Sequence, residues 1–183
     1  IEGGYKKIQG TTKYNTNVVP QVAASSERVV MSAIFNDVVL AARGGSIHRG
    51  SSGSGSWTST ITSLGTPTRD YEFKKFNFDG TDNIIITTGT SNPQILNSSF
   101  SASVVDAPGT EIVGIKTFRD TLFIFGKDKI FKLTGTSLSN FAIQAVTRRI
   151  GCIDGGSIQE FAGDIIFLAP DGLRTIAGTD RID

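Results

Sequence analysis

The stretch RRIGCIDGGSIQEFAGDIIFLAPDGLRTI, residues 148–176, contains the pattern that decides the fold. A Gly-rich turn leads into a short strand, a polar turn follows, and the apolar run IIFLA ends at a second turn, PDG. Short runs of Val, Ile, Phe and Thr bounded by Gly, Asn, Asp and Ser are typical of β-strands joined by hairpins. Because the chain has no sustained apolar stripe at helical spacing, the sequence predicts an all-β fold.

The same order of an aromatic residue, a polar turn with an aspartate and an apolar strand occurs three times before this stretch. The aspartates assigned to these turns are Asp37, Asp82, Asp120 and Asp164. A second turn and a further strand follow each time, and we expect those strands at 46–49, 94–96, 129–133 and 173–176. The sequence therefore predicts repeated antiparallel meanders.

A repeat of about 40 to 45 residues with three or four strands is typical of a β-propeller blade. The middle strands VVLAA, NIIIT, LFIF and IIFLA are continuously apolar, as expected when neighbouring blades cover both faces of a sheet. We expect a lead-in segment, about four blades of a partial propeller, and a longer parent chain. The expected ranges are 1–20 for the lead-in and 21–65, 66–108, 109–150 and 151–183 for the blades. A β-sandwich of the same strands is the alternative.

Composition narrows the functional classes. The 183 residues are 38% hydrophobic and 19% charged with a net charge of +1, which excludes a charged disordered tail and gives no overall attraction to nucleic acid. No apolar run is long enough for a membrane span. The single cysteine, Cys152, cannot form an intrachain disulfide and is expected to be a small buried apolar residue.

Catalytic and metal-binding patterns are missing from the sequence. The only histidine, His48, is expected on a strand, facing solvent or a neighbouring blade. Paired cysteines and an HExxH motif do not occur, and turn chemistry explains DGTDN, residues 79–83, better than calcium binding. We therefore predict no enzyme activity, no metal and no cofactor.

A lysine run, GKDKIFKLTG at 126–135, is the strongest local charge feature. Strand alternation would place Lys127 and Lys129 on one face and Lys132 on the other. One interpretation is a solvated edge strand that lysines protect from aggregation. The other is sequence-independent contact with DNA phosphates, helped by Arg148 and Arg149.

The segment RGGSIHRGSSGSGSWT, residues 43–58, is similar to the Asp-box hairpin of sialidase-like propellers. Ser51, Gly55, Ser56 and Trp57 carry the similarity, although the aspartate is missing and the glycine is displaced by one position. In that family the hairpin is structural. The similarity implies a propeller and leaves a carbohydrate-binding or carbohydrate-hydrolysing protein as an alternative function.

Together with this hairpin, three segments resemble the propeller part of bacteriophage tail proteins. They are GGYKKIQGTTKY at 3–14, EIVGIKTFRDTLFIFGKDKIFKLTG at 111–135 and the stretch at 148–176. The group named by this resemblance is the tail nozzle, or tail tubular protein B, of short-tailed phages, with the packaged-DNA stabilisation protein as a more distant relative. The specific part of the resemblance covers about the C-terminal third.

This resemblance implies a virion structural subunit that is assembled in the host cytoplasm. Six copies would form a ring around the tail axis, through which DNA leaves the capsid. Other copies, neighbouring tail proteins and passing DNA are the expected partners, and no catalytic residue is transferred. Candidate contacts with DNA or acidic subunits are Lys127, Lys129, Lys132, Arg148 and Arg149. Another tail or neck propeller, and a generic propeller scaffold for protein partners, are the remaining alternatives.

Overall fold

The computed structural model describes residues 29–43, 45–50, 57, 62–63, 72–78, 80–89, 92–104, 109–137 and 139–179. These residues form strands in four antiparallel sheets, with one 3₁₀ turn (Gly155–Ser157) and one short helix, α1 (Ile176–Thr179). The prediction of an all-β fold of antiparallel meanders is confirmed. The expected lead-in at 1–20 lies outside the described residues.

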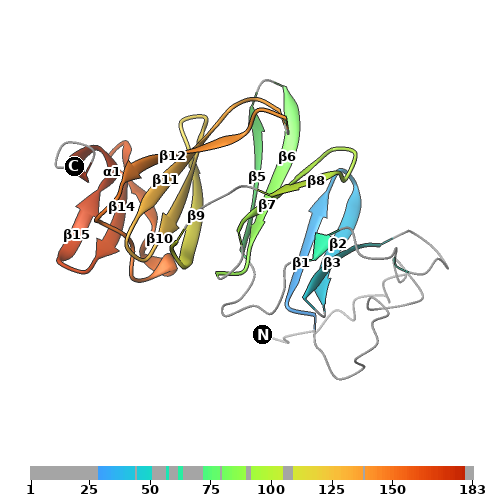
Figure 1. Ribbon diagram of the computed structural model, residues 1–183, viewed down its shortest axis with the longest axis horizontal. Helices are drawn as coiled ribbons and strands as arrows, with labels where there is room; N and C mark the ends of the chain where they lie inside the picture. Colours follow the sequence, from blue (N-terminus) through green and yellow to red (C-terminus); the bar gives the residue numbers. More distant parts are fainter. Residues whose placement is uncertain are drawn as a thin grey trace, which may run out of the picture.

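Each sheet is built from consecutive strands (Figure 1). The first sheet contains β1 (Met31–Phe35), β2 (Val38–Arg43), β3 (Ser46–Arg49) and β4 (Thr62–Ser63). The second contains β5 (Glu72–Phe78), β6 (Thr81–Thr87), β7 (Gln94–Asn97) and β8 (Ala102–Val104). The third contains β9 (Ile112–Phe118), β10 (Thr121–Gly126), β11 (Ile130–Thr134) and β12 (Ala142–Thr147). The fourth contains β13 (Gln159–Phe161), β14 (Asp164–Ala169) and β15 (Gly172–Thr175).

The first two strands of every sheet are joined by a two-residue turn that follows a phenylalanine. These phenylalanines are Phe35, Phe78, Phe118 and Phe161. Positive φ angles occur in each turn, for example 46° at Arg119 and 57° at Asp120. Two-residue turns of this kind match the right-handed twist of the flanking strands and favour Gly, Asn and Asp. The local sequence thus fixes where each hairpin reverses.

The assignment of the four aspartates to turns is confirmed for two of them and wrong for the other two. Asp37 and Asp120 occupy the second turn position, whereas Asp82 lies inside β6 and Asp164 is the first residue of β14. The fourth turn is Ala162–Gly163, where φ is 50° and 81°, so both positions have positive φ without an aspartate. The phenylalanine before the turn, and not the aspartate, is the feature that the hairpins share.

The four sheets stack face to face in chain order through three apolar cores, as the succession of colours in Figure 1 shows. Along β6, Ile84 and Ile86 pack in the core shared with the first sheet, while Ile85 packs in the core shared with the third. Alternate residues of a strand point to opposite faces. The continuous apolar run of the middle strand is therefore explained by coverage on both faces, as predicted.

The middle strand of the third sheet follows the same rule. Leu122 and Ile124 of β10 face the second sheet, and Phe123 and Phe125 face the fourth. Phe125 is fully buried, and its ring centroid lies 5.4 Å from that of Phe167. Because the described residues form four stacked sheets instead of two, a single two-sheet sandwich is not their arrangement.

The two ends of the stacked sheets carry different connections. The end that carries the four turns after the phenylalanines is called here the hairpin rim. At the opposite end, Ile112 N donates to Gly89 O at 2.8 Å, and Cys152 N donates to Gly126 O at 2.8 Å. These hydrogen bonds tie the connections between sheets to the β6 and β10 ends. This second end is called here the crossover rim.

The structure tests the expectations for Cys152 and His48. Cys152 is fully buried in the third core, as predicted, and burial raises the pKa of its thiol. His48 lies on β3 as predicted; it is buried, which excludes the solvent-facing alternative, and its Nε2 lies 3.3 Å from Arg43 O. The sequence left both alternatives open because the residues that follow His48 are polar and Gly-rich, which conceals the burial of this strand residue.

A half-buried carboxylate links the second and third sheets and should make stability depend on pH. Glu72 Oε2 accepts a hydrogen bond from Ile115 N at 3.1 Å. Burial raises the pKa of Glu72 above its ordinary 4.5, against the lowering effects of Lys74 and the Ile115 hydrogen bond. In the folded state the protonated form is therefore favoured relative to the unfolded state. The stabilisation is complete below the ordinary pKa and is lost as the pH rises through the folded-state pKa.

We expect Glu72→Gln to gain stability relative to the parent protein as the pH rises from about 4 to 7, because glutamine does not ionise. Urea unfolding at a series of pH values measures this difference. Glu72→Ala is the control, because it leaves Ile115 N without its acceptor and should be destabilising at every pH. A constant difference between Glu72→Gln and the parent across this range would contradict the prediction.

Candidate functional site

Two of the predicted basic residues lie in the turn between β10 and β11, at the crossover rim. Lys127 Nζ forms an ion pair with Glu111 Oε2 at 2.6 Å. Lys129 Nζ donates to Gly109 O at 3.3 Å and lies 3.8 Å from Asp128 Oδ2. Both ammonium groups therefore hold the segment that enters β9, and acidic neighbours offset part of their charge.

Arg148 and Arg149 lie at the same end of the third sheet. They follow β12, whose last residue, Thr147, is the register partner of Ile130 at the start of β11. Thr147 Oγ1 accepts hydrogen bonds from Arg149 N at 3.3 Å and Ile150 N at 3.2 Å, which fixes the turn of the chain. Both arginines are exposed. Four of the five predicted contact residues are thus brought to the crossover rim.

The fifth predicted residue, Lys132, is separated from the others. It lies within β11, where its register partners are Phe123 on β10 and Gln144 on β12. The interpretation of this lysine run as an edge strand is wrong, because β11 is paired on both sides. Its side chain faces the fourth sheet and lines a pocket there. The five residues do not form one basic stripe.

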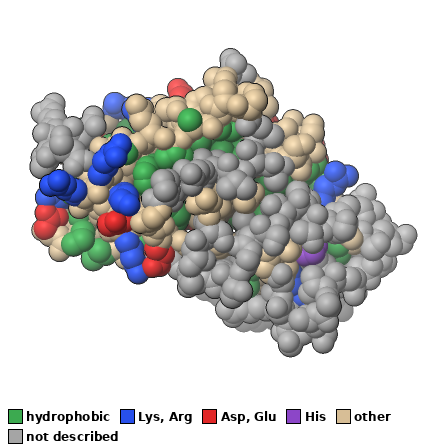
Figure 2. All heavy atoms as spheres, in the orientation of Figure 1, with side chains coloured by type: hydrophobic (Ala, Val, Ile, Leu, Met, Phe, Trp, Pro, Cys, Tyr) green, Lys and Arg blue, Asp and Glu red, His purple; other side chains and the backbone are tan. Residues whose placement is uncertain are grey.

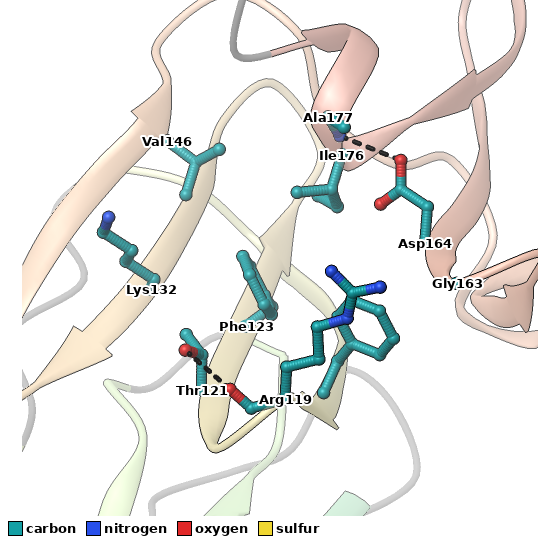
Figure 3. Close-up of a pocket in the computed structure, with 10 residues that line it drawn as sticks. Arg119, Thr121, Phe123, Lys132, Val146, Gly163, Asp164, Ile176 and Ala177 are labelled. Carbon is teal, nitrogen blue, oxygen red and sulfur yellow. Dashed lines mark hydrogen bonds between the residues drawn. The ribbon is translucent and has the colours of Figure 1, made fainter.

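This pocket, of about 310 Å³, lies between the third and fourth sheets near the hairpin rim (Figure 3). The lining residues come from both sheets and from α1. They are Phe118, Arg119, Thr121, Phe123, Lys132, Val146, Gly163, Asp164, Ile176 and Ala177. A volume of this size falls at the lower end of the range for small-molecule sites.

The charged groups of the pocket are held in different ways. Arg119 follows the strand β9, and its guanidinium carbon lies 5.0 Å from the centroid of the Phe118 ring. Asp164 accepts hydrogen bonds from Ile165 N at 2.7 Å and from Ala177 N at 3.1 Å, so its carboxylate holds the start of α1 (Figure 3). In the described part of the chain, no ion pair within 4.0 Å joins Arg119 or Lys132 to an acidic side chain.

The space-filling view shows lysine, arginine, aspartate and glutamate side chains side by side over the end of the molecule that contains the fourth sheet (Figure 2). One exposed pair there joins Arg174 to Asp171. The hydrogen bond from Arg174 lowers the pKa of Asp171, and the same bond raises the pKa of Arg174. The surface at this end is mixed in charge and not uniformly basic.

Sequence reasoning missed the pocket because residues from two different meanders form it. The sequence indicates for Arg119 only a place in the turn after Phe118, and a continuously apolar strand does not show which face Phe123 occupies. The signal available in the sequence was a cation beside Phe118 in a two-residue turn. That signal indicates a pocket only when the position of the next sheet is known.

Other expected site features fall partly outside the described residues. Ser51, Gly55 and Ser56 of the Asp-box-like hairpin and Asp79 of DGTDN are among the residues that the structure does not describe. In the described ranges, no group of three or more His, Cys, Asp or Glu side chains is placed to hold a metal ion. Within the same ranges, the structure contains no helix with the length and apolar character needed to cross a membrane.

Comparisons of the chain with protein-family models, with curated proteins and with solved structures found no match.

Proposed function

We propose that this chain is part of a β-propeller in a phage tail nozzle-type structural protein. The observation that carries the proposal is the stacking of four consecutive meanders, in which both faces of the second and third sheets are apolar and covered. A sheet of this type cannot bury both faces alone and needs a neighbour on each side. Such stacking supports a rigid wall more than a mobile binding loop.

The outer face of the fourth sheet supports a continuation of the stack. Leu173 is 74% exposed and is the register partner of Leu168, and Phe161 is 66% exposed opposite Asp164. These side chains point away from the third core, which contains Ile165 and Phe167. Exposed large apolar side chains on one sheet face are a feature of interaction surfaces. A further blade-like sheet fits this face.

The proposed mechanism is mechanical and electrostatic. Stacked sheets form the wall of a ring-shaped conduit for DNA during genome ejection, and the crossover rim supplies contacts. Lys127, Lys129, Arg148 and Arg149 would meet DNA phosphates or acidic neighbouring subunits. Because Lys127 and Lys129 are already offset by acidic side chains, contacts with DNA would be weak. Weak contact lets DNA pass without being retained.

Native mass spectrometry and electron-microscope class averages of the full-length protein test this proposal. We expect a ring with an open axis, with six copies as the expected number. A protein that stays monomeric and never enters particles would contradict it.

A paired variant sharpens the same test. Leu173→Asp places a charge on the outer face of the fourth sheet and should reduce assembly or stability of the full-length protein. Ser98→Asp, in the exposed turn after β7, is the matched control and should leave assembly unchanged. If the two variants assembled equally well and were equally stable, the outer face of the fourth sheet would not be an interaction surface.

A further inference from the structure

The pocket between the third and fourth sheets has an apolar wall that the tail role does not use. Phe123, Val146 and Ile176 line it from β10, β12 and α1 (Figure 3). Phe123 is 8% exposed and Ile176 is 9% exposed, so most of their surface is already packed in the third core. A ligand that enters the pocket would therefore meet a wall that the core holds in place, and little conformational entropy would be lost on binding.

Two cationic side chains line the same pocket. Arg119 and Lys132 come from the β9–β10 turn and from β11, and they flank Phe123 (Figure 3). Lys132 is half-buried and is the register partner of Phe123, so its stem lies beside the aromatic wall. Asp164 is the acidic side chain in the lining, and two backbone N–H groups already bind it. The lining thus has an excess of one positive charge.

A ring contact orients the exposed Arg119 side chain before any ligand arrives. Its guanidinium lies over the Phe118 ring, and Gly163 borders it on the other sheet. A side-chain carbon at Gly163 would lie 3.1 Å from Arg119 Nη2, so the missing side chain leaves room for the guanidinium. A planar guanidinium presents paired N–H groups whose geometry matches a carboxylate.

We propose that this pocket binds a small organic carboxylate. The apolar body of the ligand lies against Phe123 and Ile176, and Arg119 and Lys132 neutralise its carboxylate. A neutral ligand of the same shape would leave both cations without a counter-charge, and an inorganic anion would leave the apolar wall uncovered. Both parts of the ligand are therefore needed. This site does not depend on the proposed tail function, and either proposal can fail alone.

A titration of the ¹⁵N-labelled protein with phenylacetate, followed by NMR, tests the proposal. We expect chemical-shift changes concentrated on residues that line the pocket, and binding about tenfold tighter than for phenylacetamide or inorganic phosphate. Shift changes scattered over the surface would overturn the proposal. Equal binding of phenylacetamide would do the same, because it would show that the charge has no role.

Variants of Arg119 and Lys132 test the contribution of each cation to binding. Lys132→Met and Arg119→Gln should each weaken phenylacetate binding about tenfold, because each removes one charge-assisted contact. Lys132→Arg keeps the charge and should retain most of the affinity, which separates loss of charge from loss of fold. Lys127→Met, at the crossover rim, is the matched control and should bind as the parent does. A loss with Lys127→Met as large as with Lys132→Met would overturn the assignment.

Discussion

Replacing Phe125 with alanine is expected to lower the free energy of unfolding by about 3–5 kcal/mol. Phe125 is fully buried on β10 and packs against Phe167 of the fourth sheet with a centroid distance of 5.4 Å. Alanine would leave a cavity between two stacked sheets, and the strands on either side cannot close it without moving a whole sheet. Urea unfolding followed by far-UV circular dichroism measures the loss.

Phe161→Ala is the matched control for Phe125→Ala. The Phe161 side chain is 66% exposed on the outer face of the fourth sheet, and its truncation should change the free energy of unfolding by less than about 0.5 kcal/mol in the isolated chain. A double-mutant cycle of Phe125→Ala and Phe167→Ala should give an interaction energy of about 0.5–1.5 kcal/mol. Equal losses from Phe125→Ala and Phe161→Ala would contradict the stacking of the third and fourth sheets.

The sequence could predict the strands and their grouping because those depend on neighbours in the chain. The run IIFLA is apolar at every position, and the structure explains it through two faces with different surroundings. Ile165 and Phe167 lie in the third core, while Ile166 and Leu168 lie on the outer face. The pattern therefore shows that both faces favour apolar neighbours. It does not show which face has a neighbour within this chain.

The candidate site was less predictable because it depends on which sheets become neighbours. Strand alternation predicted that Lys132 would separate from Lys127 and Lys129. The structure places those two lysines in the turn, and a register shift lies between Ile130 and Phe131. Simple alternation does not extend through such an irregularity. That Arg119 lines the same pocket as Lys132 follows only from the folded arrangement of the hairpin rim.

The second large effect is expected at Gly151, in the segment that joins the third and fourth sheets. Gly151 is buried, and a side-chain carbon there would overlap backbone atoms of Lys127 and Asp128. The segment cannot move away freely, because Cys152 N donates to Gly126 O at 2.8 Å and Ile153 N donates to Leu168 O at 2.9 Å. We therefore expect Gly151→Ala to lower the free energy of unfolding by about 1–3 kcal/mol or more.

Thermal and urea unfolding of Gly151→Ala, compared with Gly156→Ala, would measure this effect. Gly156 is exposed, and an added carbon would meet Asp154 Oδ2 at 3.4 Å, an ordinary contact. Its replacement should change stability by less than about 0.5 kcal/mol. The difference between the two variants separates the cost of overlap with nearby backbone atoms from the general effect of replacing glycine by alanine on stability. If both variants were equally stable, the crossover segment would not pack against the β10–β11 turn, and the clustering of Lys127 with Arg148 at one rim would lose its structural basis.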